Sequence, residues 1–294
     1  MGLTIHYTLT LPGETPVDVV KAKLEQIRQR CLDLPVQKVD AELQDFEGKG
    51  CSLERIESLR ELKAPADQSL FYFLCNAGGV LGYEFDENGK PRGINLIKAK
   101  YFMFLQPSRL IGFTVIPGPG CEWFRVRLVR LPKSVLVKGD PTKFSRKFRL
   151  PVENADKWVW MGFCKTQYAS HKGDGGSIEN FLRCHLSIIA ILDYAKQIGF
   201  EVKVSDEGGF WEKRDVQALC KQLVEYNEFI AAFGGMLKDA AETEDVKIQG
   251  PIFSNPEFER LEAKGRIKLD PKVDPKLFKL LKTVIKHEKK DTEK

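Results

Sequence analysis

The sequence predicts an α+β protein with a mixed sheet, ferredoxin-like split β-α-β units at both ends and a strand-rich middle. Three observations support this prediction. Residues 1–46 follow a strand-helix-strand pattern, residues 158–240 follow a strand-helix-strand-helix pattern, and residues 70–150 alternate short apolar runs with turn signals. We expect residues 1–244 to form one globular domain and residues 245–294 to form a basic, partly helical C-terminal extension.

The composition suits a folded protein with a sizeable core. The chain has 294 residues, of which 43% are apolar and 30% charged, and its formal net charge is +5. Collagen, mucin, disordered-tail and disulfide-scaffold compositions are therefore excluded.

The N-terminal unit opens with a half-buried strand, because apolar and polar residues alternate from Leu3 to Leu11. Thr15 is a good N-cap and Pro16 fits the first position of a helix. Apolar residues then repeat at helical spacing up to Cys31, and Pro35 closes the segment. A second strand is expected near residues 36–46.

The middle of the chain is predicted from short apolar runs. Residues 47–69 are charged and indicate a loop with a short helix. The candidate strands beyond it are 71–73, 80–85, 101–105, 110–116 and 123–130. The turn sequences DENG at 86–89 and PGPG at 117–120 separate some of these runs.

The third section predicts a strand at 158–168, a loop at 169–176 and a long helix at 177–198 that stops at Gly199. A short strand at 200–205, a loop at 206–209 and a helix from Lys213 follow. The extension holds a short helix from 255–256 and a last one at 275–290. We expect this lysine-rich last helix to pack on the core of the same protein. The alternatives are that it binds a groove on a partner protein or lies on an anionic membrane.

The loops that follow the strands at 158–168 and 200–205 are expected to lie at the same end of the sheet. A strand-helix-strand connection is usually parallel, and ligands favour the carboxyl ends of strands in open α/β sheets. The loops 165–177 and 206–212 therefore form a candidate ligand site. Its predicted binding residues are Lys165, Tyr168, His171, Lys172, Gly175, Gly176, Ser177, Arg183 and Trp211.

The Gly-rich segment 171–177 leads into a helix N-terminus, where backbone N–H groups and the helix dipole favour an anion. The alternative is a flexible loop that ends with Ser177 as N-cap. Arg183 lies on a largely apolar helix and needs a partner. We expect that partner to be Asp206, Glu207 or a bound anion.

Asp206 and Glu207 are the candidate catalytic residues, as a Mg²⁺ ligand or a general base. The alternative is a structural pair that satisfies backbone N–H groups or Arg214. Cys164, His171, Cys184 and His185 suggest a zinc site or a Cys–His nucleophile, but their spacing supports neither strongly, and no set of metal ligands is predicted. Cys184 is expected to be core packing.

A basic segment, residues 125–149, holds nine basic residues and one acidic residue. Its alternation predicts arginines on the solvent face of a strand, and aromatic residues follow among the next basic ones. Such a strand can track a nucleic-acid backbone, and the alternative is an edge strand protected by charge. The candidate nucleic-acid-binding residues are Arg125, Arg127, Arg130, Arg146 and Lys147.

Several features predict a cytoplasmic location. The opening MGLTIHYTLT lacks the basic start and apolar run of a signal peptide. No stretch approaches the roughly 18 apolar residues of a membrane span. The 7 cysteines are scattered and never spaced as CxxC, which is typical of free thiols in a reducing compartment.

Four strings resemble a set of uncharacterised bacterial proteins: MGLTIHY at 1–7, FCKTQYAS at 163–170, NFLRCHLS at 180–187 and SDEGGFWEKRD at 205–215. The resemblance covers the first strand and residues 158 to about 239. It implies a bacterial intracellular protein but no activity, substrate or catalytic residue. The basic segment and the extension fall outside it.

The leading functional hypothesis is a cytoplasmic ligand-binding protein with a phosphate-type anion site at the loops 165–177 and 206–212. The alternatives are a metal-assisted enzyme on a phosphate-containing substrate and a nucleic-acid-binding module that uses the basic strand 125–149. The sequence does not identify a cofactor. The expected partners are a small anion, a nucleic acid, or a protein that binds the C-terminal helix.

Overall fold

A computed structural model describes residues 3–48, 51, 80–95, 98–140, 142–143, 146–171, 176–242, 253 and 257–268. Within them, the main sheet contains β1 (Thr4–Pro12), β2 (Lys38–Val39), β3 (Gln44–Glu47), β7 (Arg109–Ile116), β8 (Phe124–Arg130), β11 (Lys157–Lys165) and β12 (Glu201–Asp206). The strand order is β12-β1-β11-β8-β7-β2, and β3 also pairs with β7. Helices and antiparallel strand pairs together confirm the α+β class.

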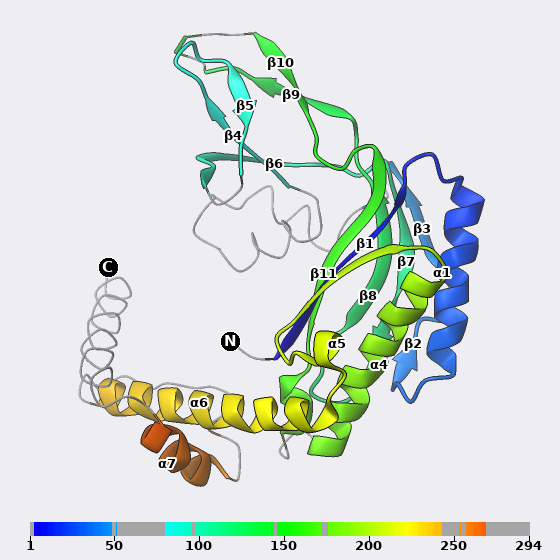
Figure 1. Cartoon of the computed structure of the whole chain (residues 1–294). Helices are drawn as coiled ribbons and strands as arrows, with labels where there is room; N and C mark the ends of the chain where they lie inside the picture. The colour runs from blue at the N-terminus through cyan, green and yellow to red at the C-terminus, as the bar shows by residue number, and fades with distance from the viewer. Residues whose placement is uncertain are drawn as a thin grey trace.

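Two smaller sheets extend from one end of the main sheet (Figure 1). One contains β4 (Val80–Phe85), β5 (Pro91–Gly93) and β6 (Tyr101–Phe104), and the other pairs β9 (Ser134–Lys138) with β10 (Lys147–Pro151). The predicted strands at 80–85, 101–105, 110–116 and 123–130 are confirmed, whereas β5, β9 and β10 were not predicted. The loop and helix at 47–69, apart from residues 47, 48 and 51, and the strand at 71–73 lie outside the described residues.

The first strand has the predicted alternation, and its residues Ile5, Leu9 and Leu11 are almost wholly buried. Helix α1 (Val17–Leu32) follows, but Pro16 stands at its N-cap rather than Thr15. The Thr15 carbonyl instead accepts a hydrogen bond from the Trp158 indole at 3.2 Å. The predicted Thr15 cap is therefore wrong by one position.

The second strand, predicted at 36–46, is split into β2 and β3. Both pair with β7, and Asp40 lies in the break between them. Its backbone N–H donates to the Thr114 carbonyl, and its side-chain Oδ2 accepts the Thr114 N–H at 2.8 Å. A carboxylate thus replaces a backbone acceptor, so the regular ladder is interrupted without leaving the partner strand unsatisfied.

The C-terminal unit runs from β11 through α4 (Ile178–Gln197) to β12. Strand β11 ends at Lys165 and a 3-10 turn, Gln167–Ser170, follows, so the strand predicted to reach 168 is too long. Strand β1 lies between β11 and β12 and is antiparallel to both. The two strands are therefore parallel to each other, and their carboxyl ends lie at the same edge, as predicted.

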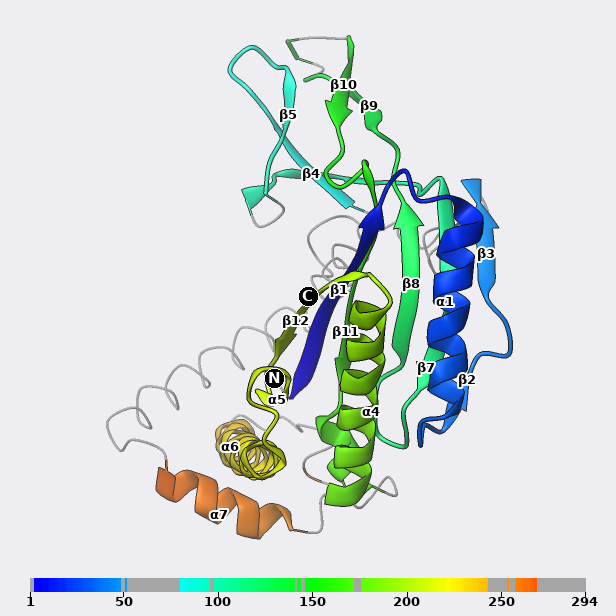
Figure 2. The ribbon, with the colours of Figure 1, turned by 45° about the vertical axis from the view of Figure 1, so that its right-hand side comes forward.

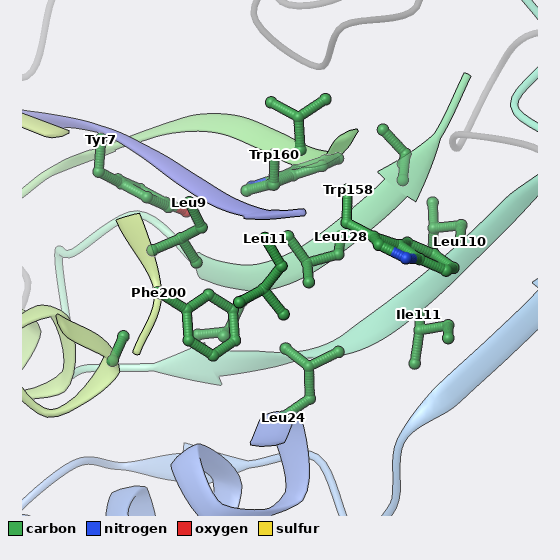
Figure 3. Packing of buried hydrophobic residues seen from close by; sticks show 14 of the residues in the cluster. Tyr7, Leu9, Leu11, Leu24, Leu110, Ile111, Leu128, Trp158, Trp160 and Phe200 are labelled. Atoms are coloured by element: carbon green, nitrogen blue, oxygen red, sulfur yellow. The ribbon is translucent and has the colours of Figure 1, made fainter. Parts of the chain in front are cut away.

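Helices α1 and α4 cover one face of the main sheet (Figure 2). The main core lies between them and this face. Figure 3 shows Leu11 and Phe200 pointing toward Leu24 of α1, with Trp158 beside Leu110 and Ile111. Burial of such side chains supplies most of the free energy that holds the layers together.

Helices α6 (Val216–Glu242) and α7 (Phe258–Lys268) lie at the end of the sheet where β1 begins (Figure 1). The helix predicted from Lys213 is interrupted, because α5 (Phe210–Lys213) ends at Arg214 in the left-handed conformation, with φ of 54°. The short helix predicted from 255–256 is found as α7, and its partner helix is α6. The predicted helix at 275–290 lies outside the described residues.

A search of the helices within the described residues finds none with the length and hydropathy of a membrane span.

Candidate functional site

The carboxyl ends of β11 and β12 enclose a buried polar network. His185 of α4 bridges it, because its Nδ1 lies 3.0 Å from Thr166 Oγ1 and its Nε2 lies 3.2 Å from Asp206 Oδ2. The His185 and Asp206 side chains have no solvent exposure. Asp206 also accepts the backbone N–H groups of Gly208, Phe210 and Trp211 at 2.8–3.0 Å.

These contacts control the ionisation of Asp206. Burial alone would raise the pKa of its carboxyl, but the hydrogen bond and charge of His185 and the N–H groups of Trp211 and Gly208 outweigh burial and lower the pKa. The carboxylate is thus held ionised with both oxygens occupied. This is the arrangement expected of a structural residue that orders the loop 206–212.

Glu207 points away from Asp206. Its Oε2 accepts the Thr4 N–H at 2.9 Å, and its Oε1 lies 3.7 Å from His6 Nε2. The two carboxylates therefore do not face one ion. Among the residues that the structure describes, no cluster of three or more metal-ligating side chains occurs.

The Gly-rich segment is only partly described, since Lys172 and Gly175 lie outside the described residues. Gly176 is buried, and a Cβ at this position would lie 2.4 Å from the Ala169 carbonyl oxygen. Only a residue without a side chain therefore fits here, because two backbone segments pack closely together. A substitution there would report on folding rather than on ligand binding.

The N-terminus of α4 is capped from within the chain. Ser177 is the N-cap, as predicted, and accepts the Asn180 N–H at 3.0 Å. Hydrogen bonds from its own N–H and from Ser177 lower the pKa of the Glu179 carboxyl. The negative charge of Glu179 in the first turn thus already interacts favourably with this end of the helix dipole.

Arg183 does not pair with Asp206 or Glu207, so that expectation is wrong. Its guanidinium donates to the carbonyls of Pro35 and Pro117 and to Asn180 Oδ1. These oxygens serve as hydrogen-bond acceptors for the positively charged guanidinium. The side chain thereby links α4 to the two loops that contain Pro35 and Pro117.

The remaining predicted loop residues contact one another rather than converging on a cavity. Lys165 Nζ lies 5.6 Å from the centre of the Tyr168 ring, and the rings of Tyr168 and His171 are 5.1 Å apart. His171 is only 4% exposed. Trp211 packs under the Arg214 guanidinium at 4.7 Å.

The cysteines of this region are packed as neutral thiols. Cys121 Sγ lies 3.7 Å from Cys164 Sγ, and Cys184 contacts Asn180 rather than His185. The hydrogen bond with Cys121 and burial raise the pKa of Cys184. Neutral, buried thiols suit core packing, as expected for Cys184, and do not suit a nucleophile.

The basic segment is distributed over β8 and the two strands of the β9–β10 hairpin. Strand β8 lies between β11 and β7, so it is not an edge strand, and Arg127 is buried rather than on the solvent face. Arg127 donates to Gln44 and Thr114, and Arg130 lies over the Trp158 ring. Gly112 faces Arg127 without a side chain, which makes room for its stem.

The side of the main sheet away from α1 and α4 carries a second group of chemically capable side chains. Opposed residues in antiparallel pairs point to the same face. Registers across β12, β1, β11 and β8 place the following residues on this side, which we name the open face: His6, Thr8, Trp123, Arg125, Met161, Phe163, Glu201, Lys203 and Ser205.

Aromatic and basic groups alternate across the open face. The His6 and Phe163 rings are 6.1 Å apart on neighbouring strands, and Arg125 lies 5.9 Å from the Trp123 ring. Trp123 is 51% exposed and Met161 is 37% exposed. A shallow hollow of about 210 Å³ lies between His6, Thr8, Met161, Lys203 and Ser205.

Sequence reasoning identified only Arg125 of this group. His6 and Thr8 were noted as the polar half of the first strand, and Phe163 lies in a string used only for resemblance. Alternation along each strand predicts which of its own residues share a face. Only the strand order shows which strands are neighbours and therefore which residues come together.

Comparisons with protein-family models, curated proteins and solved structures gave no significant match.

Proposed function

We propose that this protein binds single-stranded nucleic acid on the open face of its main sheet. The observation that carries the proposal is the pair of rings, His6 and Phe163, side by side on the two strands β1 and β11. Unpaired bases stack on aromatic side chains that an open sheet presents, and each stacked base contributes about 1–3 kcal/mol.

Charge on either side of the rings supports the same proposal. Lys203 on β12 is 76% exposed at its side chain, where its Nζ lies 3.2 Å from Glu201 Oε1, and Arg125 on β8 holds its guanidinium beside Trp123. These two residues flank the rings on neighbouring strands, where a phosphate backbone crossing the sheet would pass. The Glu207 carboxylate lies 3.7 Å from the His6 ring and adds one negative charge beside it.

The β9–β10 hairpin extends this positive charge beyond the sheet. Lys147 and Lys138 lie directly opposite each other, and like charges in that position repel. Arg146 precedes Lys147 on the same hairpin. A bound phosphate would relieve the repulsion, so the hairpin is a second contact for the nucleic-acid backbone.

Fluorescence anisotropy with a labelled single-stranded 12-nucleotide probe tests the proposal. We expect binding that weakens as salt rises and a preference for the single strand over its duplex. Phe163→Ala should weaken binding about tenfold, because one stacking contact is lost. Phe229→Ala is the matched control, since Phe229 is 40% exposed on α6, away from the sheet.

Two results would overturn the proposal. One is an absence of binding to any single strand at low salt. The other is an equal loss of affinity in Phe163→Ala and Phe229→Ala.

A further inference from the structure

A cavity of about 450 Å³ lies where the smaller sheets meet the open face. Leu81 and Gly93 line it from the β4–β5 hairpin, Glu153 and Asn154 from the segment after β10, and Met161 from β11. We infer that this cavity takes one unstacked nucleobase of the strand bound on the open face, and this inference rests on the proposed function.

The cavity is continuous with the open face. Met161 lines both the cavity and the shallow hollow that contains His6. Met161 and Phe163 point to the same face of β11, and residues two apart on a strand are separated by about 6.6–6.8 Å. The nucleotide next to the one stacked on Phe163 can therefore place its base in the cavity without a sharp bend in the nucleic-acid backbone.

The lining has the two kinds of surface that a base requires. Leu81, Val159 and Met161 give apolar walls, which suit the flat faces of a base. Glu153, Asn95 and Asn154 add carboxylate and amide groups, which suit its polar edge. A purely apolar occupant would desolvate these polar groups without giving them hydrogen bonds.

The chemistry of Glu153 also indicates which bases fit. An ionised carboxylate only accepts hydrogen bonds. Cytosine offers it the two N–H groups of an exocyclic amino group, whereas uracil offers the single N3–H between two carbonyl oxygens that repel a carboxylate, so cytosine is favoured. Discrimination by one such contact is expected to be about fivefold or more.

The test compares the affinities for two single-stranded probes, a 12-nucleotide run of cytidines and an equal run of uridines, in a neutral buffer. Gly93→Phe should fill the cavity with little strain, because a Cβ at Gly93 has only Leu81 Cδ1 near it, at 3.9 Å. Arg92→Phe is the matched control, since Arg92 is next to Gly93 and points to the other side of β5.

We expect the wild type to prefer cytidines by about fivefold or more, and Gly93→Phe to bind both probes with nearly equal affinity. Arg92→Phe should keep the preference. Glu153→Gln changes an exposed side chain without loss of volume and should lower the preference as well.

The outcomes separate the two claims. If both probes bind and neither Gly93→Phe nor Glu153→Gln changes their ratio, the cavity does not take a base, while the proposed function stands. If neither probe binds, the proposed function fails, and this inference fails with it.

Discussion

Two regions of the main sheet contrast sharply in how their polar side chains are used. At the carboxyl ends of β11 and β12, the side chains of Asp206, His185 and Arg183 point inward and bond to the protein itself. On the open face, Phe163, Arg125 and Lys203 lie over hydrogen-bonded strands at the surface of the sheet. The first region holds the fold together, and the second is the one that we propose contacts a nucleic acid.

The contrast teaches that a dense set of functional residue types does not by itself make a site. The loops 165–177 and 206–212 hold many such residues because an irregular backbone needs acceptors for its N–H groups. Asp206 supplies acceptors for three of them. The strands of the open face satisfy their backbone groups through the ladder, so their side chains are not needed as acceptors for backbone N–H groups.

The largest effect is expected from Asp206→Ala. Removal of this carboxylate leaves His185, the buried N–H of Gly208 and two part-buried N–H groups without their acceptor, so the free energy of unfolding should fall by about 3–5 kcal/mol. At this chain length that corresponds to a Tm lower by roughly 10 °C. Denaturant and thermal unfolding would measure both quantities.

Glu207→Ala is the matched control, because it removes the neighbouring carboxylate from an exposed position. Its cost should be about 1 kcal/mol or less. If Asp206→Ala lowered the free energy of unfolding by no more than this, the buried network would not be what orders the loops. The two regions would then not differ in the way described above.

An intermediate effect is expected from acid. The folded protein lowers the pKa of Asp206, so the carboxylate contributes stability that is fully present above its ordinary value of about 3.9. That contribution is lost as the pH falls through the lower pKa of the folded state. Urea unfolding of the wild type and Asp206→Asn between neutral pH and pH 3 measures it.

The stability gap between these two proteins should narrow as the pH falls below about 4. A gap that stays constant down to pH 3 would mean that the charge of Asp206 contributes nothing and that only its shape matters.

Local patterns in the sequence predicted much of the fold. The alternation in β1, the helix signals around Ser177 and Gly199, and the turns at 86–89 and 117–120 depend on neighbouring residues, and the structure confirms them. The β9–β10 hairpin was not predicted, because each strand has only 5 residues and basic residues interrupt the apolar pattern of β10. Pairing between the two strands defines them more than any long local pattern does.

The candidate site was less accessible to sequence reasoning. The meeting of the two loops at one edge followed correctly from the parallel course of β11 and β12. Whether Arg183 faces a carboxylate or carbonyl oxygens depends on loops more than 60 residues away in the chain, at Pro35 and Pro117. The open face needs the strand order β12-β1-β11-β8, which no local pattern contains.

A pair of matched charge reversals tests the central claim that the open face, rather than the loop end, contacts the nucleic acid. Lys203 lies on the open face and Lys213 on α5 at the loop end, and both are exposed. Lys203→Glu and Lys213→Glu change the net charge equally, so a difference between them reports local contact.

The measurement is the affinity of each variant for the single-stranded 12-nucleotide probe as a function of salt. We predict that Lys203→Glu weakens binding about tenfold near physiological salt and lowers the slope of log K against log salt by about 1, whereas Lys213→Glu changes affinity less than about twofold. Equal losses, or a larger loss in Lys213→Glu, would contradict the account and return the site to the loops.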